Sequence, residues 1–96
     1  LWIAFAMPSA GRVVIDDGAV RALTVSGRSL LPTGVVEVQG DFSADDAVEV
    51  LDSTGTVVAK GLVRAGSDEA ARAAGRRSDE VDLDELIHRD DLVVLS

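Results

Sequence analysis

A small, mainly β domain with short α-helices is the fold class that this sequence predicts. Short apolar runs alternate with three groups of turn residues, Asp-Asp-Gly, Pro-Thr-Gly and Gly-Asp, across residues 14–42. The 96 residues suit one domain, and the 47% apolar fraction supports a packed core and argues against disorder. The predicted order of elements along the chain is β-α-β-β-β-β-α-β.

The first strand and the first helix are predicted next to each other. Residues 12–15 read Arg-Val-Val-Ile, a run of β-branched residues typical of a strand. Asp16 or Asp17 can cap the helix that follows, because a carboxylate accepts hydrogen bonds from the free amide groups of the first turn. Apolar residues then recur at helical spacing, and Gly27 is the expected exit from the helix.

The next apolar stretch, residues 30–38, is interrupted at Pro32. Proline cannot donate to a sheet ladder, so this point should be an edge, a bulge or a turn. Val36 and Val38 alternate with polar residues, which predicts a half-buried strand with these two valines on its inner face. Gly40 is expected to turn the chain after it.

A hairpin is predicted from two short strands, residues 48–51 and 56–59. Asp52 and Gly55 stand at the first and last positions of the connection, and this pairing favours a type I turn. Gly61 is expected to mark a bulge before a further apolar pair.

The last third of the chain predicts helix followed by strand. Ser67 is expected to cap a small Ala-rich helix, which Gly75 ends in the left-handed conformation. Ser78 is expected to start a second helical segment that runs to about Ile87. A final strand is predicted over residues 91–95.

The charge of the chain is strongly acidic. Seventeen acidic residues against nine Lys and Arg give a formal net charge of −8, which repels polyphosphates at long range. Only residues 1–36, with three Arg and two Asp, are slightly basic. The chain has no cysteine and therefore no disulfide, which fits a reducing compartment.

Two motifs suggest chemistry but are better explained by structure. The sequence His-Arg-Asp at residues 88–90 mimics a protein-kinase catalytic loop, yet the metal-binding Asn and the glycine-rich loop of such kinases are missing. The acidic run at residues 79–85 lacks the glycine-centred spacing of a calcium loop, so a solvated helix face is the favoured interpretation. A single histidine cannot build a multi-histidine zinc site.

Several short motifs in the same order resemble a PUA domain, and most closely the PUA domain of bacterial glutamate 5-kinases. The motifs lie at residues 16–23, 29–35, 40–42, 74–78 and 88–92. The resemblance implies a small pseudo-barrel with short helices packed against the sheet. It also implies a parent enzyme that transfers the γ-phosphate of ATP to the side-chain carboxylate of L-glutamate, in proline biosynthesis.

None of the amino-acid kinase motifs is present in this sequence. We therefore expect no catalytic, cofactor-binding or metal-binding residue here, with ATP and Mg bound by an upstream kinase domain. The chain begins at Leu1 rather than Met, and Trp2-Ile3-Ala4 resembles the segment that joins the two domains in that family. We expect residues 1–10 to be a linker and residues 11–96 to be the PUA domain of a longer, cytoplasmic enzyme. The implied partners are that kinase domain and further copies of the chain, with no membrane.

An alternative function is RNA binding, because the first helix of RNA-binding PUA domains and the segment after it form their nucleic-acid surface. Two arginines on that surface could meet phosphates, and glycine lets backbones come close. The competing structural interpretation is that the glycines permit turns and the proline packs the barrel; aromatic stacking residues are lacking. The candidate residues for weak binding of structured RNA are Gly18, Ala19, Arg21, Arg28, Pro32 and Gly34.

Overall fold

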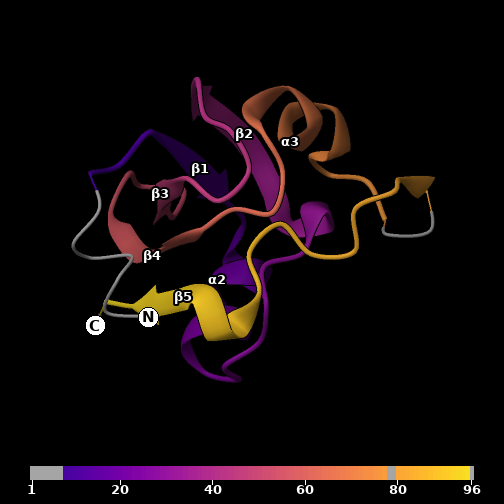
Figure 1. Cartoon of the computed structure of the whole chain (residues 1–96). Helices are drawn as coiled ribbons and strands as arrows, with labels where there is room; N and C mark the ends of the chain where they lie inside the picture. Colours follow the sequence, from indigo (N-terminus) through magenta and orange to yellow (C-terminus); the bar gives the residue numbers. More distant parts are fainter. Residues whose placement is uncertain (1–7, 78–79, 96) are drawn as a thin grey trace.

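A curved sheet of five strands with two α-helices is seen in the computed structural model, which describes residues 8–77 and 80–95 (Figure 1). The sheet is mixed, in the order β2-β1-β3-β4-β5; β1 and β3 are parallel and the other neighbours antiparallel. The predicted mainly β class is confirmed, with three strands rather than four between the helices. The strands are β1 (Gly11–Ile15), β2 (Val35–Gly40), β3 (Ala47–Leu51), β4 (Val57–Leu62) and β5 (Leu92–Val94). The helical elements are α2 (Asp17–Thr24), α3 (Ser67–Ala73) and the 3-10 turns η1 (Pro32–Gly34) and η3 (Arg89–Asp91).

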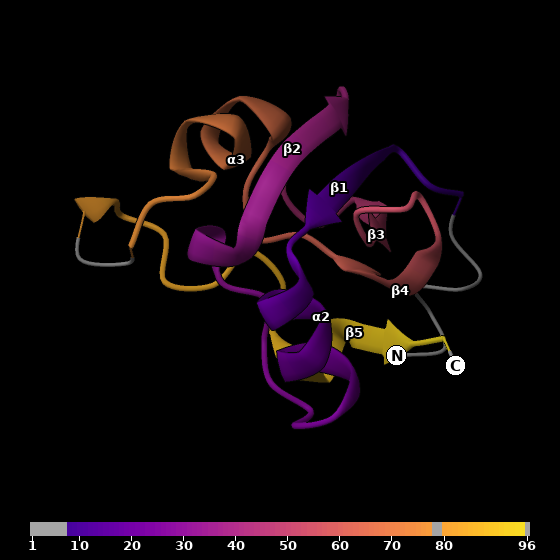
Figure 2. The same cartoon turned by 180° about the vertical axis from the view of Figure 1, so that it is seen from behind.

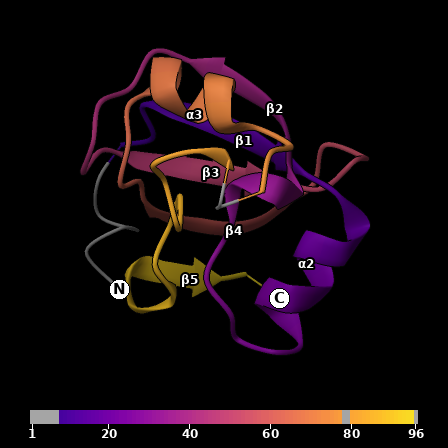
Figure 3. The same ribbon diagram turned by 90° about the vertical axis from the view of Figure 1, so that its right-hand side faces the viewer.

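The two helices lie toward opposite edges of the sheet. Helix α3 packs beside β2, whereas α2 lies toward β5 (Figures 2 and 3). The chain after α3 crosses from the β2 edge to the β5 edge. The core that these elements enclose is apolar, and no buried residue of the described part is polar or charged. Its largest fully buried side chains include Ile15, Leu23, Leu30, Leu86 and Ile87.

The predicted N-cap of α2 and the predicted exit from this helix are both found. Asp16 is the N-cap, and its Oδ1 accepts a hydrogen bond from the Ala19 amide at 2.7 Å. Gly27, with a φ of +61°, lets the chain leave the helix, and the Arg28 amide donates to the Ala22 carbonyl at 3.0 Å. The helix is thus bounded at both ends by residues that the sequence marks.

The β3–β4 hairpin is confirmed as well. Its turn is closed by a hydrogen bond from the Gly55 amide to the Asp52 carbonyl at 3.1 Å. The Asp52 carboxylate also accepts hydrogen bonds from the Thr54 hydroxyl at 2.6 Å and from the Thr56 amide at 3.0 Å. These bonds, the one from the Thr54 hydroxyl first, hold the pKa of Asp52 below its usual value because they favour the charged form.

The inner face of β2 differs from the prediction by one residue. Val38 is half-buried and packs against the core as predicted, but Val36 is 64% exposed and Val35 is buried in its place. Val35 pairs with the buried Ile15 after a register shift between Val14 and Ile15. Paired residues face the same side of an antiparallel sheet, so this pairing turns Val35 inward and Val36 outward.

The bulge predicted at Gly61 is not found. Gly61 lies within β4, in register with Val48, and β4 runs on unbroken to Leu62. A Cβ at Gly61 would lie 2.7 Å from Ile87 Cγ2 and 2.8 Å from the Asp91 carbonyl oxygen. The absence of a side chain at Gly61 therefore allows the C-terminal segment to pack closely against the sheet.

The helix predicted from Ser78 to about Ile87 is wrong in its described part. Ser78 itself lies outside the described residues, and from residue 80 to Ile87 the chain forms no α-helix. The Leu30 amide donates to the Ile87 carbonyl at 2.9 Å, and the Leu86 amide donates to the Leu30 carbonyl at 2.8 Å. The backbone groups that a helix would use are bonded to a distant segment instead.

The end of α3 was predicted correctly and its start was not. Gly75 has a φ of +78°, the expected left-handed exit. The N-cap is Gly66, and the Ser67 hydroxyl does not cap its own helix. It accepts a hydrogen bond from the Phe42 amide at 3.2 Å and lies 3.3 Å from Asp41 Oδ1, so it ties α3 to the end of β2.

Candidate functional site: a pocket between α2 and the C-terminal segment

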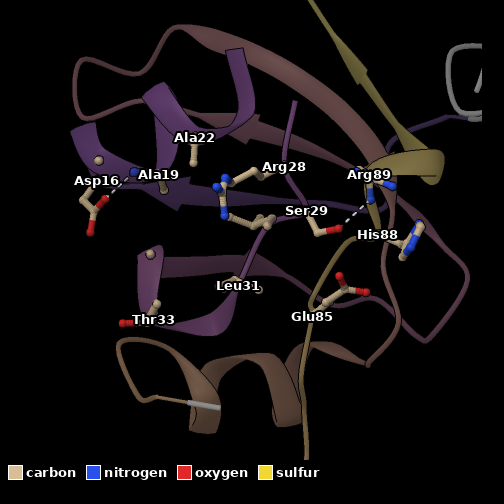
Figure 4. Close-up of a pocket in the computed structure, with 13 residues that line it drawn as sticks. Asp16, Ala19, Ala22, Arg28, Ser29, Leu31, Thr33, Glu85, His88 and Arg89 are labelled. Atoms are coloured by element: carbon tan, nitrogen blue, oxygen red, sulfur yellow. Dashed lines mark hydrogen bonds between the residues drawn. The ribbon is translucent and has the colours of Figure 1, made fainter. Parts of the chain in front are cut away.

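An open pocket of about 560 Å³ lies between α2, the segment before β2 and the segment before β5 (Figure 4). Its walls thus come from two stretches that follow each other closely in the chain and from a third that lies about fifty residues later. The lining residues are Asp16, Gly18, Ala19 and Ala22 from the α2 side, residues 28–31 with Thr33 and Gly34 from the middle segment, and Glu85, His88 and Arg89 from the C-terminal segment.

Helix α2 is held against η1 by a small-residue contact. A Cβ at Gly34 would lie only 2.6 Å from the Ala19 Cβ, so a larger residue would push the two elements apart. The Asp16 amide donates to the Gly34 carbonyl at 3.0 Å. The start of α2 is therefore fixed to η1 both by a backbone hydrogen bond and by the close contact of a side chain.

The opposite wall is fixed by contacts between residues about sixty positions apart. Leu30 and Ile87 form an isolated antiparallel bridge. Beside it, the Ser29 hydroxyl oxygen accepts a hydrogen bond from the Arg89 amide at 2.9 Å, drawn as a dashed line in Figure 4. The middle segment and the C-terminal segment therefore form one continuous wall.

Two of the four Asp, Glu and Arg residues that line the pocket are arginines. Arg28 and Arg89 are exposed, and neither forms an ion pair with another residue of the described chain. The Glu85 carboxylate is already paired, with Arg64 Nη1 at 3.1 Å. In Figure 4 the Arg28 side chain lies between Ala22 of α2 and Leu31.

His88 has a structural bond on one ring nitrogen. Its Nδ1 accepts a hydrogen bond from the Asp90 amide at 3.0 Å, which caps η3. An Nδ1 that accepts a hydrogen bond places the ring proton on Nε2, so this imidazole is a donor at Nε2.

The predicted nucleic-acid residues divide into two groups. Gly18, Ala19, Arg28 and Gly34 line the pocket. Pro32 is buried, and its carbonyl accepts a hydrogen bond from the Gly75 amide at 2.8 Å. Arg21 is exposed on α2 but is not part of the lining.

Sequence reasoning missed Ser29, Glu85, His88 and Arg89 as lining residues. His88 and Arg89 belong to two sequence motifs, one that mimics a kinase loop and one that resembles PUA domains, but neither motif places them beside α2. No local pattern connects them with α2, because the contact is made by chain segments distant in sequence.

The described residues contain no group of three or more acidic, His or Cys side chains placed to hold a metal ion. Within the same ranges, no helix has the length and apolarity needed to cross a membrane.

The PUA domain family matches residues 11–84, which is most of the chain. The chain belongs to the PUA domain family. The PUA domain of Aeropyrum pernix, solved as a tartrate complex, superposes with a TM-score of 0.59 and is 31% identical; the match covers 85% of this chain and 45% of that one. A chain of an archaeal box H/ACA sRNP complex superposes with a TM-score of 0.61 at 25% identity, covering 84% of this chain and 26% of the other.

Several similar curated proteins are glutamate 5-kinases. The glutamate 5-kinases of Streptomyces coelicolor and Thioalkalivibrio sulfidiphilus are 45% and 46% identical to this PUA domain, over 99% and 98% of its length. That of Thermosynechococcus vestitus is 44% identical over 97%. The chain spans only 27% of the length of each of these three relatives.

Proposed function

We propose that this PUA domain is a non-catalytic accessory domain of a glutamate 5-kinase. The observation that carries the proposal is identity of about 45% over nearly the whole chain, to relatives of which the chain is about a quarter. Phosphorylation of L-glutamate with ATP, in proline biosynthesis, is then the work of a linked kinase domain, which also binds ATP and Mg. Residues 1–10 are the lead-in from that domain, residues 11–96 are the accessory domain, and the enzyme is cytoplasmic.

The role of the domain in this proposal is to influence stability, assembly or inhibition by proline through contacts with the kinase domain. Removing it from the full-length enzyme should leave glutamate phosphorylation in place, because the catalytic groups lie elsewhere. The oligomeric state or the proline inhibition curve should change. The measurements are steady-state kinetics with and without proline, and molar mass by light scattering.

A matched control separates loss of contacts from loss of a folded domain. The full-length enzyme with Ile87→Ala keeps every residue of the domain surface but weakens its core, since Ile87 is fully buried. If the folded domain supports the enzyme, the molar mass or the proline inhibition curve of this variant should become like that of the truncated enzyme on warming. A truncated enzyme with unchanged mass, kinetics and proline response would refute the accessory role.

RNA binding is the second candidate function, and the observation that favours it is the cluster of free cations around α2. Arg21 and Arg28 make no ion pair within the described residues, and a chain of similar fold belongs to an archaeal box H/ACA sRNP complex. Structured RNA should bind weakly, with an affinity that falls steeply as salt rises. Reversing Arg21 and Arg28 to Glu should abolish binding, whereas reversing Arg72 and Arg76 on and after α3, an equal change in charge, should not. Equal losses in the two double variants would mean that only net charge acts.

A further inference from the structure

The pocket beside α2 differs in charge from the rest of the molecule. The whole chain has seventeen acidic residues and nine Lys and Arg, but the lining has two of each, Asp16 and Glu85 against Arg28 and Arg89. Glu85 is neutralised by Arg64 from outside the lining, and Asp16 Oδ1 is engaged by the Ala19 amide. The lining is therefore balanced in formal charge on a molecule that is otherwise acidic, and its two arginines have no ion-pair partner in the described part of the chain.

Hydrogen-bond donors also outnumber free acceptors in the pocket. The Ser29 oxygen accepts from the Arg89 amide, which leaves the hydroxyl proton available to donate. His88 uses Nδ1 as an acceptor, which leaves Nε2–H as a donor. With the guanidinium groups of Arg28 and Arg89, four side chains of the lining have donor groups that no hydrogen bond or ion pair within the described residues uses.

Much of the remaining lining is apolar. Ala19 and Ala22 contribute to it from α2, and Leu30 and Leu31 contribute from the middle segment. The volume of about 560 Å³ lies within the range of roughly 300–1,000 Å³ that is common for small-molecule sites. An apolar wall with a few converging polar groups is the usual composition of such a site.

We infer that this pocket binds one small organic oxyanion, a carboxylate or a phosphate monoester with a short apolar or sugar body. The oxyanion accepts charge-assisted hydrogen bonds from Arg28 and Arg89 and hydrogen bonds from Ser29 and His88, while its body lies against Ala22 and Leu31. The inference goes beyond the accessory role and does not rest on it. A phosphate group of an RNA strand presents the same chemistry, so the test must distinguish a free small molecule from a polymer.

The experiment is a titration of the nitrogen-15-labelled 96-residue chain, followed through its backbone amide signals. The probes are succinate, inorganic phosphate, uridine monophosphate and a short single-stranded RNA, each at constant ionic strength with chloride as the reference anion. Saturable shifts confined to residues 28–31 and 85–89 are expected with at least one of the three small anions. No saturable shift with any of them would overturn the inference, and so would binding of the RNA alone.

Two variants test which groups hold the ligand. Arg28→Gln and Arg89→Gln should each weaken binding by about tenfold, because each removes one charge-assisted hydrogen bond. Arg72→Gln is the matched control, since Arg72 is exposed on α3 outside the lining, and it should leave the affinity unchanged. Equal weakening by all three variants would show non-specific attraction of anions and would overturn the inference. Amide spectra of each variant without ligand establish that it is folded.

Discussion

The β3–β4 hairpin and the chain from residue 80 to β5 are held in place in opposite ways. In the hairpin, the turn bonds run between Asp52 and residues no more than four positions away. In the C-terminal segment, Ile87 and Arg89 bond to Leu30 and Ser29, almost sixty residues earlier. The hairpin can be recognised from its own residues because its bonds are local. The C-terminal segment acquires its conformation only through its bonds to the distant residues Ser29 and Leu30. Three substitutions test this difference.

The largest expected effect is on the C-terminal segment. Ile87→Ala removes a fully buried side chain and should cost about 2–5 kcal/mol of unfolding free energy, measured by urea denaturation. Val36→Ala, at a valine that is 64% exposed, should stay within about 0.5 kcal/mol. If Ile87→Ala does not fold, Ile87→Val should still cost about 0.5–1.5 kcal/mol. Equal effects at positions 36 and 87 would show that the segment is not part of the core.

A smaller effect is expected at the long-range bond beside the pocket. Ser29→Ala leaves the Arg89 amide without its acceptor and should cost about 0.5–1.5 kcal/mol. Hydrogen exchange of the Arg89 amide should become faster while the amides of the β3–β4 hairpin keep their protection. Ser26→Ala is the control, because Ser26 is exposed and forms no side-chain hydrogen bond with the described residues. An Arg89 amide that exchanges at the same rate in both variants would contradict the proposed tie.

The smallest effect is expected at the hairpin turn, and it depends on pH. Hydrogen bonds lower the pKa of Asp52 from its usual 3.8, so the charged carboxylate stabilises the folded state above that pH, and this contribution is lost as the pH falls through the lowered pKa. Asp52→Asn should therefore lower the thermal midpoint slightly at neutral pH, with the difference from the parent chain shrinking in acid below about pH 4. Asp82→Asn removes an exposed carboxylate from the C-terminal segment as a control. A difference that is the same at neutral and acid pH would mean that the charge of Asp52 does not stabilise the turn.

The candidate site was predictable only on one side. The α2 side of the pocket, with Gly18, Ala19 and Gly34, lies close to a capping Asp and a proline turn that the sequence displays. Arg28 follows directly from the predicted helix exit at Gly27. The other wall, with Glu85, His88 and Arg89, could not be placed, because their positions depend on the Leu30–Ile87 bridge rather than on any neighbouring residue.

The sequence by itself determined the elements whose signals are local. These are the Asp16 cap, the Asp52 turn and the left-handed exits at Gly27 and Gly75, where side-chain hydrogen bonds or backbone freedom act within a few residues.

Only the tertiary structure decided three features. These are which valine of β2 faces inward, the close packing that leaves no room for a side chain at Gly61, and the absence of an α-helix from residue 80 to residue 87. Each of these outcomes depends on a partner distant in sequence: Ile15 for Val35, Ile87 for Gly61, and Leu30 for the C-terminal segment. The apolar spacing indicates that Leu83, Leu86 and Ile87 are buried. A helix formed by this segment and an extended segment bridged to a distant strand-like partner would bury them equally well. The hydrogen-bond partner that the folded chain brings to Ile87 selects between the two, and that partner is part of the wall of the pocket.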